Sequence, residues 1–304
     1  MPVVSVLLPV YNAMPYLKDA VASVLGQTFA DIEVIALDDA STDGSLEYLR
    51  GLADPRLDVV ARPKSGLSLN LNYGIGIARA PLIARMDADD ISLPTRFERQ
   101  VARMNAEQEL VACGCDLRFI DPAGEIGAGH QYYADDALIR WNLLTDSAFA
   151  HPGMMLRKAA LERAGLYRRE QEPAEDYALW LELAKLGRLA NVPEVLLHYR
   201  IHPGSVSSRR VDVQRELVRE FSLRHLVTGG YAADEGEAAA FRAIARGEAS
   251  GYSPAVDSYI RVAGRFLAEH PGAAKIARRK LLGLAKRSRG WDRIRCLGKA
   301  IFFR

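Results

Sequence analysis

Short apolar runs and amphipathic segments alternate along the first hundred residues, and this alternation constrains the fold more than any other feature. Runs rich in Val, Ile and Leu predict strands, and segments in which apolar residues recur every three to four positions predict helices. The predicted strands cover residues 3–10, 32–39, 57–61 and 81–86, and the predicted helices cover 15–28, 41–52 and 68–79. Because consecutive strands joined by helices pair in parallel, we expect an α/β fold with helices on the faces of a sheet.

The alternation fades after about residue 105, and the rest of the chain predicts a different arrangement. Residues 173–187 have the pattern of an amphipathic helix that ends at Gly187, and from about residue 211 the chain is almost entirely helical. The remaining predicted elements are strands within 110–121 and 194–202 and helices at 135–145 and 157–164. We expect one domain over residues 1–210 and a helical extension over 211–304.

Charge and cysteine content exclude little by themselves. The net charge of +2 names no class of partner, and the three cysteines include a C-G-C pair that does not match a zinc-binding spacing. The first apolar run is short and lacks a basic flank, so we expect a strand there and not a signal peptide. No run reaches the roughly 18 apolar residues of a membrane span. We expect a cytoplasmic protein, either free or at the inner face of the cell membrane.

Three aspartates, Asp87, Asp89 and Asp90, lie within four positions directly after the predicted strand 81–86. In open α/β sheets, ligands bind outside the carboxyl ends of the strands. Grouped carboxylates at that edge suit a hard divalent cation such as Mg²⁺ or Mn²⁺, which relieves their mutual repulsion. The alternative is a solvated acidic turn in which Asp90 caps the next helix.

Polar residues also follow the first two predicted strands. Pro9 is expected to end the first strand, and Tyr11 just beyond it either stacks on a flat ring or packs within the turn. Asp39 ends the second strand, where a carboxylate can accept hydrogen bonds from a nucleotide base or ribose. The alternative there is a helix cap formed by Asp39 or Ser41.

Two further groups of charged residues lie in the second half of the domain. Glu175 and Asp176 open the predicted helix 173–187, where acidic side chains are also favoured by the helix dipole. His198, Arg200 and His202 alternate along a predicted strand and would therefore share one face. Three potential cations on one face require an anion opposite them, unless the face is simply an exposed polar one.

The segments "VSVLLPVYNAMPYLKDAVASVLGQTFADIEVIALDDASTDGS" and "SGLSLNLNYGIGIARAPLIARMDADDISLPTRFERQ" resemble the family 2 inverting nucleotide-sugar glycosyltransferases. The resemblance runs from residue 3 to about 207 and does not cover the C-terminal hundred residues. It implies the GT-A fold, which is a Rossmann-like mixed sheet flanked by helices, followed here by a C-terminal helical extension. It also divides the domain into a nucleotide-binding half, about 1–105, and an acceptor half, about 106–210.

On the nucleotide side, the resemblance implies a pocket for the uracil of a UDP-sugar. Asp39 matches the residue that binds the base, and the segment from Pro9 to Tyr11 lines the same pocket, with Arg62 close to the base. Asp87 matches the first aspartate of the family's DxD motif and is expected to contact the nucleotide and the metal. Leu71 stands where the family often has an arginine, so a packing role is expected for the Asn72 that follows.

The resemblance also implies the metal site and the catalytic base. Asp89 would bind the Mn²⁺ or Mg²⁺ that bridges the diphosphate, with Asp87 and Asp90 as further ligands. Asp176, with Glu175 beside it, matches the general base that removes the acceptor proton in a single inverting displacement. The pattern "YRxHxxS" places Arg200 and His202 near the leaving diphosphate, and His198 lies beside them.

The C-terminal segment 275–304 carries eleven Lys or Arg residues and one acid, interspersed with apolar residues. A basic amphipathic helix of this kind can bind an anionic membrane surface, which would suit a lipid-linked acceptor. The alternative is a helix packed on the rest of the protein with its basic face in solvent. We expect no nucleic-acid partner.

The reaction expected from these residues is sugar transfer from a nucleotide-sugar, with UDP favoured, to a hydroxyl of a glycan or a lipid-linked acceptor in cell-surface polysaccharide synthesis. A catalytically inactive nucleotide-binding scaffold on the same fold is the first alternative. A nucleotidyltransferase is the second, but it would show a Gly-rich basic loop after the first strand, where this chain has "PVYNAMPYL".

Overall fold

The structure is a computed structural model that describes residues 1–205, 210–248, 254–287 and 300. The chain forms two compact units. The first consists of Met1–Ala134 and Phe149–Gln214, and the second of Asp135–Ala148 and the described residues after Gln214. Among the described helices, none is both long enough and apolar enough to cross a membrane.

The predicted parallel sheet forms the beginning of the first unit. Its four strands are β1 (Val4–Val10), β2 (Ile32–Asp38), β3 (Leu57–Ala61) and β4 (Leu82–Arg85). β1 lies between β2 and β4, β3 pairs with the other side of β2, and all of these pairings are parallel. β1, β2 and β4 are buried almost throughout, which explains why their sequences are continuously apolar and do not alternate.

The sheet continues through strands from the second half of the unit and becomes mixed. These strands are β5 (Ile91–Ser92), β6 (Leu110–Ile120), β7 (Ile126–His130), β8 (Met155–Arg157) and β9 (Arg188–Arg200). β8 runs antiparallel to both β4 and β6, whereas β6 and β9 are parallel to each other. The strand order among the described residues is β3-β2-β1-β4-β8-β6-β9-β5, with β7 attached to β6. The predicted α/β fold with a mixed sheet is confirmed.

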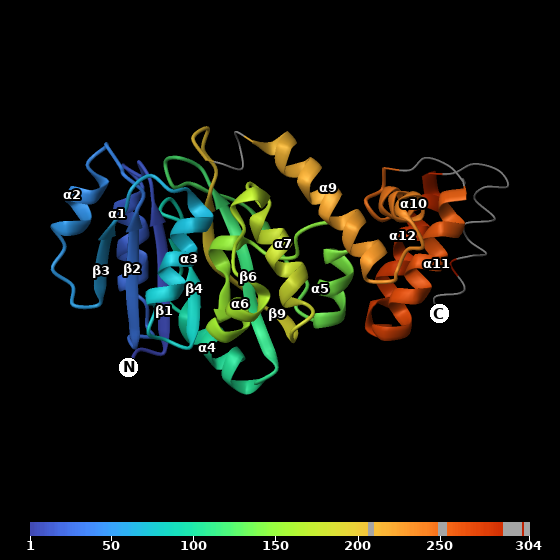
Figure 1. Cartoon of the computed structure of the whole chain (residues 1–304), viewed down its shortest axis with the longest axis horizontal. Helices are drawn as coiled ribbons and strands as arrows, with labels where there is room; N and C mark the ends of the chain where they lie inside the picture. Colours follow the sequence, from blue (N-terminus) through green and yellow to red (C-terminus); the bar gives the residue numbers. More distant parts are fainter. Residues whose placement is uncertain (206–209, 249–253, 288–299, 301–304) are drawn as a thin grey trace. The chain divides into compact units, whose positions relative to one another are not determined.

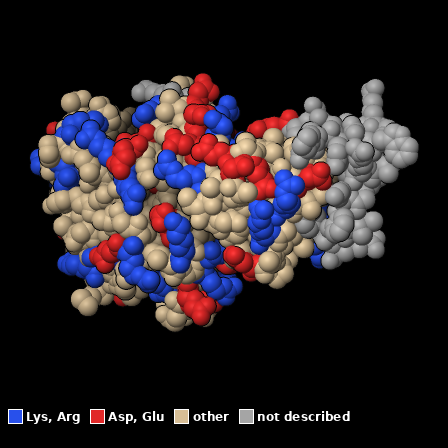
Figure 2. Space-filling model, turned by 45° about the vertical axis from the view of Figure 1, so that its right-hand side comes forward, with Lys and Arg blue, Asp and Glu red and all other residues tan. Residues whose placement is uncertain are grey.

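Helices cover this sheet and close its hydrophobic core. They are α1 (Leu17–Leu25), α2 (Ser45–Arg50), α3 (Leu67–Ile77), α4 (Arg96–Ala106), α6 (Lys158–Ala164) and α7 (Glu175–Leu183). Figure 1 shows α3 running along the strands of the first half. The core contains apolar residues from β1, β2 and β4 together with residues of α1, α4 and β6. On the face of the molecule drawn in Figure 2, acidic and basic side chains are interspersed.

Three local expectations were wrong. Pro9 does not end β1 but pairs with Leu37 inside it. The main chain of Leu7 faces β4, because Leu7 O accepts a hydrogen bond from Met86 N. Pro9 is two residues further along β1 and therefore faces the same side, but β4 has already ended there. The missing N–H of Pro9 therefore removes no hydrogen bond between strands. α2 begins at Ser45 and not at residues 41–42, and α7 ends at Leu183, before Gly187.

The second unit is a helical bundle. Its helices are α5 (Asp136–Leu143), α9 (Val211–Thr228, which begins in the first unit), α10 (Glu235–Ala245), α11 (Pro254–Glu269) and α12 (Ala274–Arg287). Trp141 of α5 is buried edge-to-face against Phe241 at 5.6 Å and Phe266 at 5.5 Å between ring centroids. We expected the segment that carries α5 to lie within the acceptor half. It packs instead with the C-terminal helices, because these aromatic contacts hold it there.

Candidate functional site

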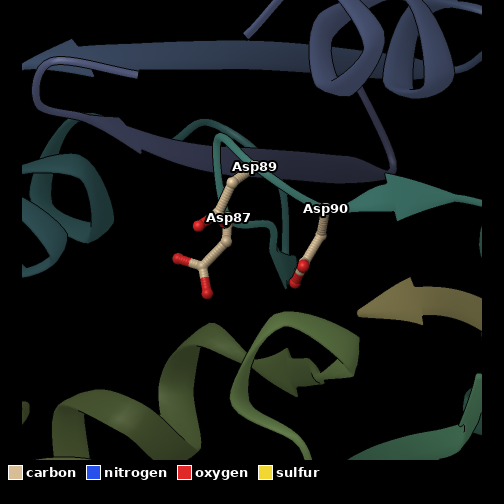
Figure 3. A group of neighbouring side chains, drawn as sticks. All are labelled: Asp87, Asp89 and Asp90. Carbon is tan, nitrogen blue, oxygen red and sulfur yellow. The ribbon is translucent and has the colours of Figure 1, made fainter. Parts of the chain in front are cut away.

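The acidic loop that follows β4 brings three carboxylates together. One carboxylate oxygen from each of Asp87, Asp89 and Asp90 lies within 4.8 Å of the others. Figure 3 shows all three side chains leaving this loop on the same side. At such separations like charges repel strongly unless a cation or hydrogen-bond donors compensate them. The loop therefore has the donor set and the spacing that suit a hard divalent cation.

Each of these carboxylates already has a donor within the chain. Asp87 forms an ion pair with Arg85, and His202 Nε2 lies 2.9 Å from Asp89 Oδ2. Arg200 N donates to Asp90 Oδ1 at 2.7 Å. Asp90 does not cap the next helix, because α4 begins at Arg96 and has Thr95 at its N-cap. Asp90 Oδ2 is buried and has no hydrogen-bond partner among the described residues. A buried carboxylate oxygen without a hydrogen-bond donor, close to two other carboxylates, is suited to serve as a ligand of a divalent cation.

The protonation of the acidic loop reflects the same crowding. Burial raises the pKa of Asp90 well above its ordinary value, and the charges of Asp87 and Asp89 raise it further. Burial also raises the pKa of Asp87, against the opposing charge of Arg85. A bound divalent cation would reverse these shifts by favouring the charged carboxylates.

Asp39 lies at the carboxyl end of β2 and is hydrogen-bonded to the turn before α3. Ser65 N donates to Asp39 Oδ1 at 2.6 Å, and Gly66 N donates to Asp39 Oδ2 at 3.2 Å. Lys64 Nζ completes the set at 2.8 Å from Oδ2. Burial acts to raise the pKa of Asp39, but donation from Lys64 and Ser65 outweighs it, and the pKa is lowered.

Tyr11 follows β1 and lies beside this carboxylate. Its side chain is 52% exposed, and Lys64 Nζ lies 2.8 Å from the centre of its ring. Asp39 N donates to Val10 O at 2.8 Å, which joins the ends of β1 and β2. Arg62 follows β3, where its guanidinium donates to Asn70 at 2.6 Å and stacks on the ring of Tyr73. The first four strands therefore present Pro9–Tyr11, Asp39, Arg62 and Asp87 at one edge of the sheet.

Glu175 and Asp176 form the first turn of α7. Burial and the neighbouring charge of Asp176 raise the pKa of Glu175 to about 8, and Glu175 Oε2 is buried without a partner among the described residues. Burial also raises the pKa of Asp176, although Tyr177 N donates to its Oδ1 at 2.7 Å. The charge of Asp87 raises the pKa of Asp176 as well, so the first turn of α7 and the acidic loop lie within electrostatic range.

The three basic residues near the end of β9 do not share one strand face as expected. β9 ends at Arg200, so His202 lies in the turn beyond the strand and reaches the carboxylate of Asp89 from there. The side chain of Arg200 donates to the main-chain carbonyl of Asp89 at 2.8 Å. His198 pairs with Ile91 across β5 and β9, and burial lowers the pKa of its imidazole.

Some residues at the site were not identified from the sequence. Arg85 is buried at the end of β4, pairs with Asp87 and bears on the pKa values of Glu175 and Asp176. Its signal was a single arginine in an apolar strand directly before the aspartates. Lys64 carried no comparable signal because its contacts depend on the turn before α3. Asn72, expected to pack, donates to Tyr167 O at 2.8 Å and so links α3 to the segment that follows α6.

Comparison with protein-family models matches residues 5–165 to the family described as "Glycosyl transferase family 2". An uncharacterized glycosyltransferase of Haemophilus influenzae is 31% identical over 241 residues, which cover 74% of this chain and 73% of that protein. The O-antigen biosynthesis glycosyltransferase WbnJ of Escherichia coli is 30% identical, with 74% of this chain and 91% of that protein covered. The chondroitin synthase of Pasteurella multocida is 26% identical over 77% of this chain, but this match spans only 24% of that longer protein.

Solved structures show the same fold at low sequence identity. S. aureus TarS 1–349 in complex with UDP-GlcNAc has a TM-score of 0.64 and 15% identity, with 100% of this chain and 90% of that chain covered. The mannosyltransferase PcManGT of Pyrobaculum calidifontis, in complex with GDP-Man and Mn²⁺, has a TM-score of 0.55 and 16% identity, with 99% and 80% covered. Together with the family model and the relatives, these structures show that the chain belongs to glycosyl transferase family 2 and is a glycosyltransferase with a GT-A fold.

Proposed function

We propose that this glycosyltransferase inverts the anomeric centre of a sugar that it moves from a nucleotide donor to an acceptor hydroxyl, with a divalent metal as cofactor. The observation that carries the proposal is the convergence of the Asp87, Asp89 and Asp90 carboxylates within 4.8 Å directly after β4. They follow β4, which is parallel to β1, and β1 is in turn parallel to β2; Tyr11 and Asp39 directly follow these two strands. Ligand sites of open α/β sheets lie at this edge.

Asp89, with Asp87 and Asp90, would hold Mn²⁺ or Mg²⁺. The Mn²⁺ in the structure of PcManGT supports a divalent metal in a protein of this fold. When bound, the ion supplies positive charge to the leaving diphosphate. The chain would add the imidazole of His202, which lies 2.9 Å from Asp89 Oδ2, on the same side of the reaction. His198, two residues before the end of β9, is proposed near the diphosphate as well.

The donor is proposed to be a UDP-sugar. The half-exposed ring of Tyr11 offers a stacking surface, and Asp39 beside it offers an acceptor for an N–H of the base. Pro9 and Arg62 lie at the neighbouring strand ends around this position, and Asp87 would be the residue between it and the metal. The TarS structures in complex with UDP-GlcNAc and with UDP support this donor class.

Asp176 is proposed as the general base on the acceptor side. One carboxylate suffices for an inverting displacement, because the acceptor oxygen attacks directly and no covalent sugar intermediate is formed. Glu175 beside it keeps its own proton around neutral pH, because its pKa is raised to about 8.

The acceptor is proposed to be a hydroxyl of a glycan or a lipid-linked saccharide in cell-surface polysaccharide synthesis. The names of the WbnJ and chondroitin synthase relatives support this setting. Attachment to the inner face of the membrane would use the basic segment 275–304. In its described part, α12 buries Ile276 and Leu281 within the helical unit while Lys275, Arg279 and Lys286 are exposed, so charge and not apolar insertion would provide the attraction. Most of 288–304 lies outside the described residues.

Vesicle flotation tests the membrane proposal separately from catalysis. The protein should float with vesicles that contain about 30% phosphatidylglycerol at low salt and be released at about 0.5 M NaCl, because the Debye length is then only a few ångströms. Equal recovery with purely zwitterionic vesicles would contradict an electrostatic attachment.

The test of the catalytic proposal is a panel of nucleotide-sugars with Mn²⁺, in which released nucleotide is measured. We expect release from a UDP-sugar that is abolished by EDTA, by Asp89→Ala and by Asp176→Asn, while Asp54→Asn, in a surface ion pair away from the site, retains it. UDP binding without turnover in any combination would favour the inactive scaffold. Release of pyrophosphate from UTP and a sugar 1-phosphate, with no release of UDP from the nucleotide-sugars, would favour a nucleotidyltransferase.

A further inference from the structure

Arg200 is the last residue of β9, and its guanidinium is committed to the main chain of two other segments. Nε donates to Asp89 O at 2.8 Å, and Nη1 donates to Asp121 O at 3.0 Å and to Pro122 O at 3.3 Å. The side chain is 2% exposed. The guanidinium carbon lies 4.6 Å from the centre of the Tyr16 ring. Nε and Nη1 therefore donate within the protein, the face of the guanidinium lies on Tyr16, and Nη2 lies 3.8 Å from Asp19 Oδ2.

Arg200 also holds the acidic loop through its own main chain. Its N–H donates to Asp90 Oδ1 at 2.7 Å, while its side chain holds the carbonyl of the preceding residue, Asp89. The start of the loop is fixed separately, because Arg96 Nη2 donates to Arg85 O at 2.6 Å and Met86 N donates to Leu7 O at 3.1 Å. The loop is thus anchored at both ends, and Arg200 anchors the end that carries two of the three aspartates.

Such anchoring matters because the three carboxylates repel one another. Without an external hold, a short loop would relieve the repulsion by turning its side chains apart, and a cation would then have to gather them again at a cost in affinity. The planar fork of an arginine can bind several carbonyls in fixed directions, which an ammonium cannot do. Asp90 Oδ2 illustrates the effect of this anchoring. It is buried and has no hydrogen-bond donor among the described residues, yet the Asp90 carboxylate stays close to those of Asp87 and Asp89.

We propose that Arg200 is a positioning residue that holds Asp89 and Asp90 converged for a divalent cation before any nucleotide binds, and that it is not a ligand of the diphosphate. This inference rests on the proposed metal site. It departs from the role that the "YRxHxxS" pattern implied, because the side chain is 2% exposed, its Nε and Nη1 donate to carbonyls, and its Nη2 lies 3.8 Å from the carboxylate of Asp19.

The test is the affinity for Mn²⁺ in the absence of nucleotide, measured by the electron paramagnetic resonance signal of free Mn²⁺. Arg200→Lys keeps the charge but loses the fork, and we expect its dissociation constant for Mn²⁺ to rise about 10- to 100-fold, the range for residues that support metal ligands. Arg200→Gln, which is neutral and keeps one donor group, supplies a second variant and should lose a similar factor.

Arg157→Lys is the matched control. Arg157 also binds main-chain carbonyls, Leu110 O at 2.6 Å and Met104 O at 2.8 Å, but it lies at the end of β8 away from the acidic loop. This variant should lose comparable stability in thermal unfolding and keep the wild-type affinity for Mn²⁺. A loss of Mn²⁺ affinity confined to the Arg200 variants supports positioning.

Two other results overturn the inference in distinguishable ways. Wild-type affinity for nucleotide-free Mn²⁺ in the Arg200 variants, combined with weaker binding of UDP, would show that Arg200 acts on the diphosphate. Absence of Mn²⁺ binding by the wild-type protein at millimolar concentrations would refute the proposed metal site, and the positioning role with it.

Discussion

Lys64 Nζ lies 2.8 Å from Asp39 Oδ2, and the same ammonium lies 2.8 Å from the centre of the Tyr11 ring. A lysine thus stands between the carboxylate and the aromatic surface that are proposed to receive the donor base. The side chain of Lys64 is half-exposed and belongs to the turn before α3, so it can leave without disturbing the sheet. A base that stacks on Tyr11 and donates to Asp39 must displace it.

Removing this lysine should strengthen nucleotide binding. Lys64→Met abolishes an ion pair and a cation–π contact, each worth about 1 kcal/mol or less at an exposed position, so we expect UDP to bind roughly fivefold tighter in isothermal titration calorimetry with Mn²⁺. Lys18→Met is the control, because it removes a lysine whose Nζ likewise faces a tyrosine, at 5.7 Å from the centre of the Tyr48 ring. Weaker UDP binding by Lys64→Met would show that the lysine contacts the nucleotide itself.

The ion pair between Arg85 and Asp87 should behave asymmetrically on mutation. Arg85 is almost fully buried whereas Asp87 is 29% exposed, so Asp87→Asn strands a buried guanidinium and should lower the free energy of unfolding by about 3 kcal/mol. Arg85→Met leaves a carboxylate that water can reach and should cost less.

The double variant Arg85→Met/Asp87→Asn should lose less than the sum of the two single variants, because neither charge is then left without its partner. Urea denaturation in EDTA provides the three values. Strict additivity would mean that the pair contributes no coupling.

Glu175 should make the protein less stable as the pH rises. Its pKa is raised from 4.5 to about 8 by burial and by Asp176, so the folded state keeps a proton that the unfolded chain releases above pH 4.5. Stability relative to Glu175→Gln should therefore fall between pH 4.5 and about 8 and level off above that. Melting temperatures across this range measure it.

Glu182→Gln serves as the control for that titration, since Glu182 lies on the same helix but is exposed and paired with Lys185. It should follow the wild type at every pH. A wild-type melting curve that runs parallel to that of Glu175→Gln would argue against a protonated Glu175.

Glu237 should have the opposite dependence in the helical unit. Burial acts to raise its pKa, but donation from Arg265 and Arg261, at 2.7 and 2.5 Å, outweighs it and lowers the pKa from 4.5 to about 2. Its contribution to stability is therefore complete above pH 4.5 and is lost as the pH falls through 2.

Glu237→Gln should accordingly destabilise the helical unit by roughly 1–2 kcal/mol at neutral pH, and the difference should shrink in acid. Circular dichroism melts at several pH values measure this. Glu216→Gln, in an exposed pair with Arg219, should have a much smaller effect. A Glu237→Gln deficit that persists unchanged at pH 2 would rule out the ionised carboxylate as its cause.

The sequence alone determined what depends on neighbours along the chain. The continuous apolar runs of β1, β2 and β4 and the helical periods between them predicted the parallel sheet, because burial on both faces requires such runs. The position of Asp87, Asp89 and Asp90 after β4 was equally readable, since it needs only the end of one strand.

The tertiary structure alone decided which distant groups meet. Arg200 reaches the carbonyl of Asp89 across 111 positions, and Trp141 joins Phe241 in the helical unit across a similar span of chain. Lys64 is near Asp39 in sequence, but it meets the carboxylate only because the turn before α3 folds back over the end of β2. The local periodicity of a sequence shows which face of a helix or strand is buried. The contacts between distant residues depend on the order in which the strands pair and on how the ends of different elements pack. The spacing of residues along one element contains no information about either.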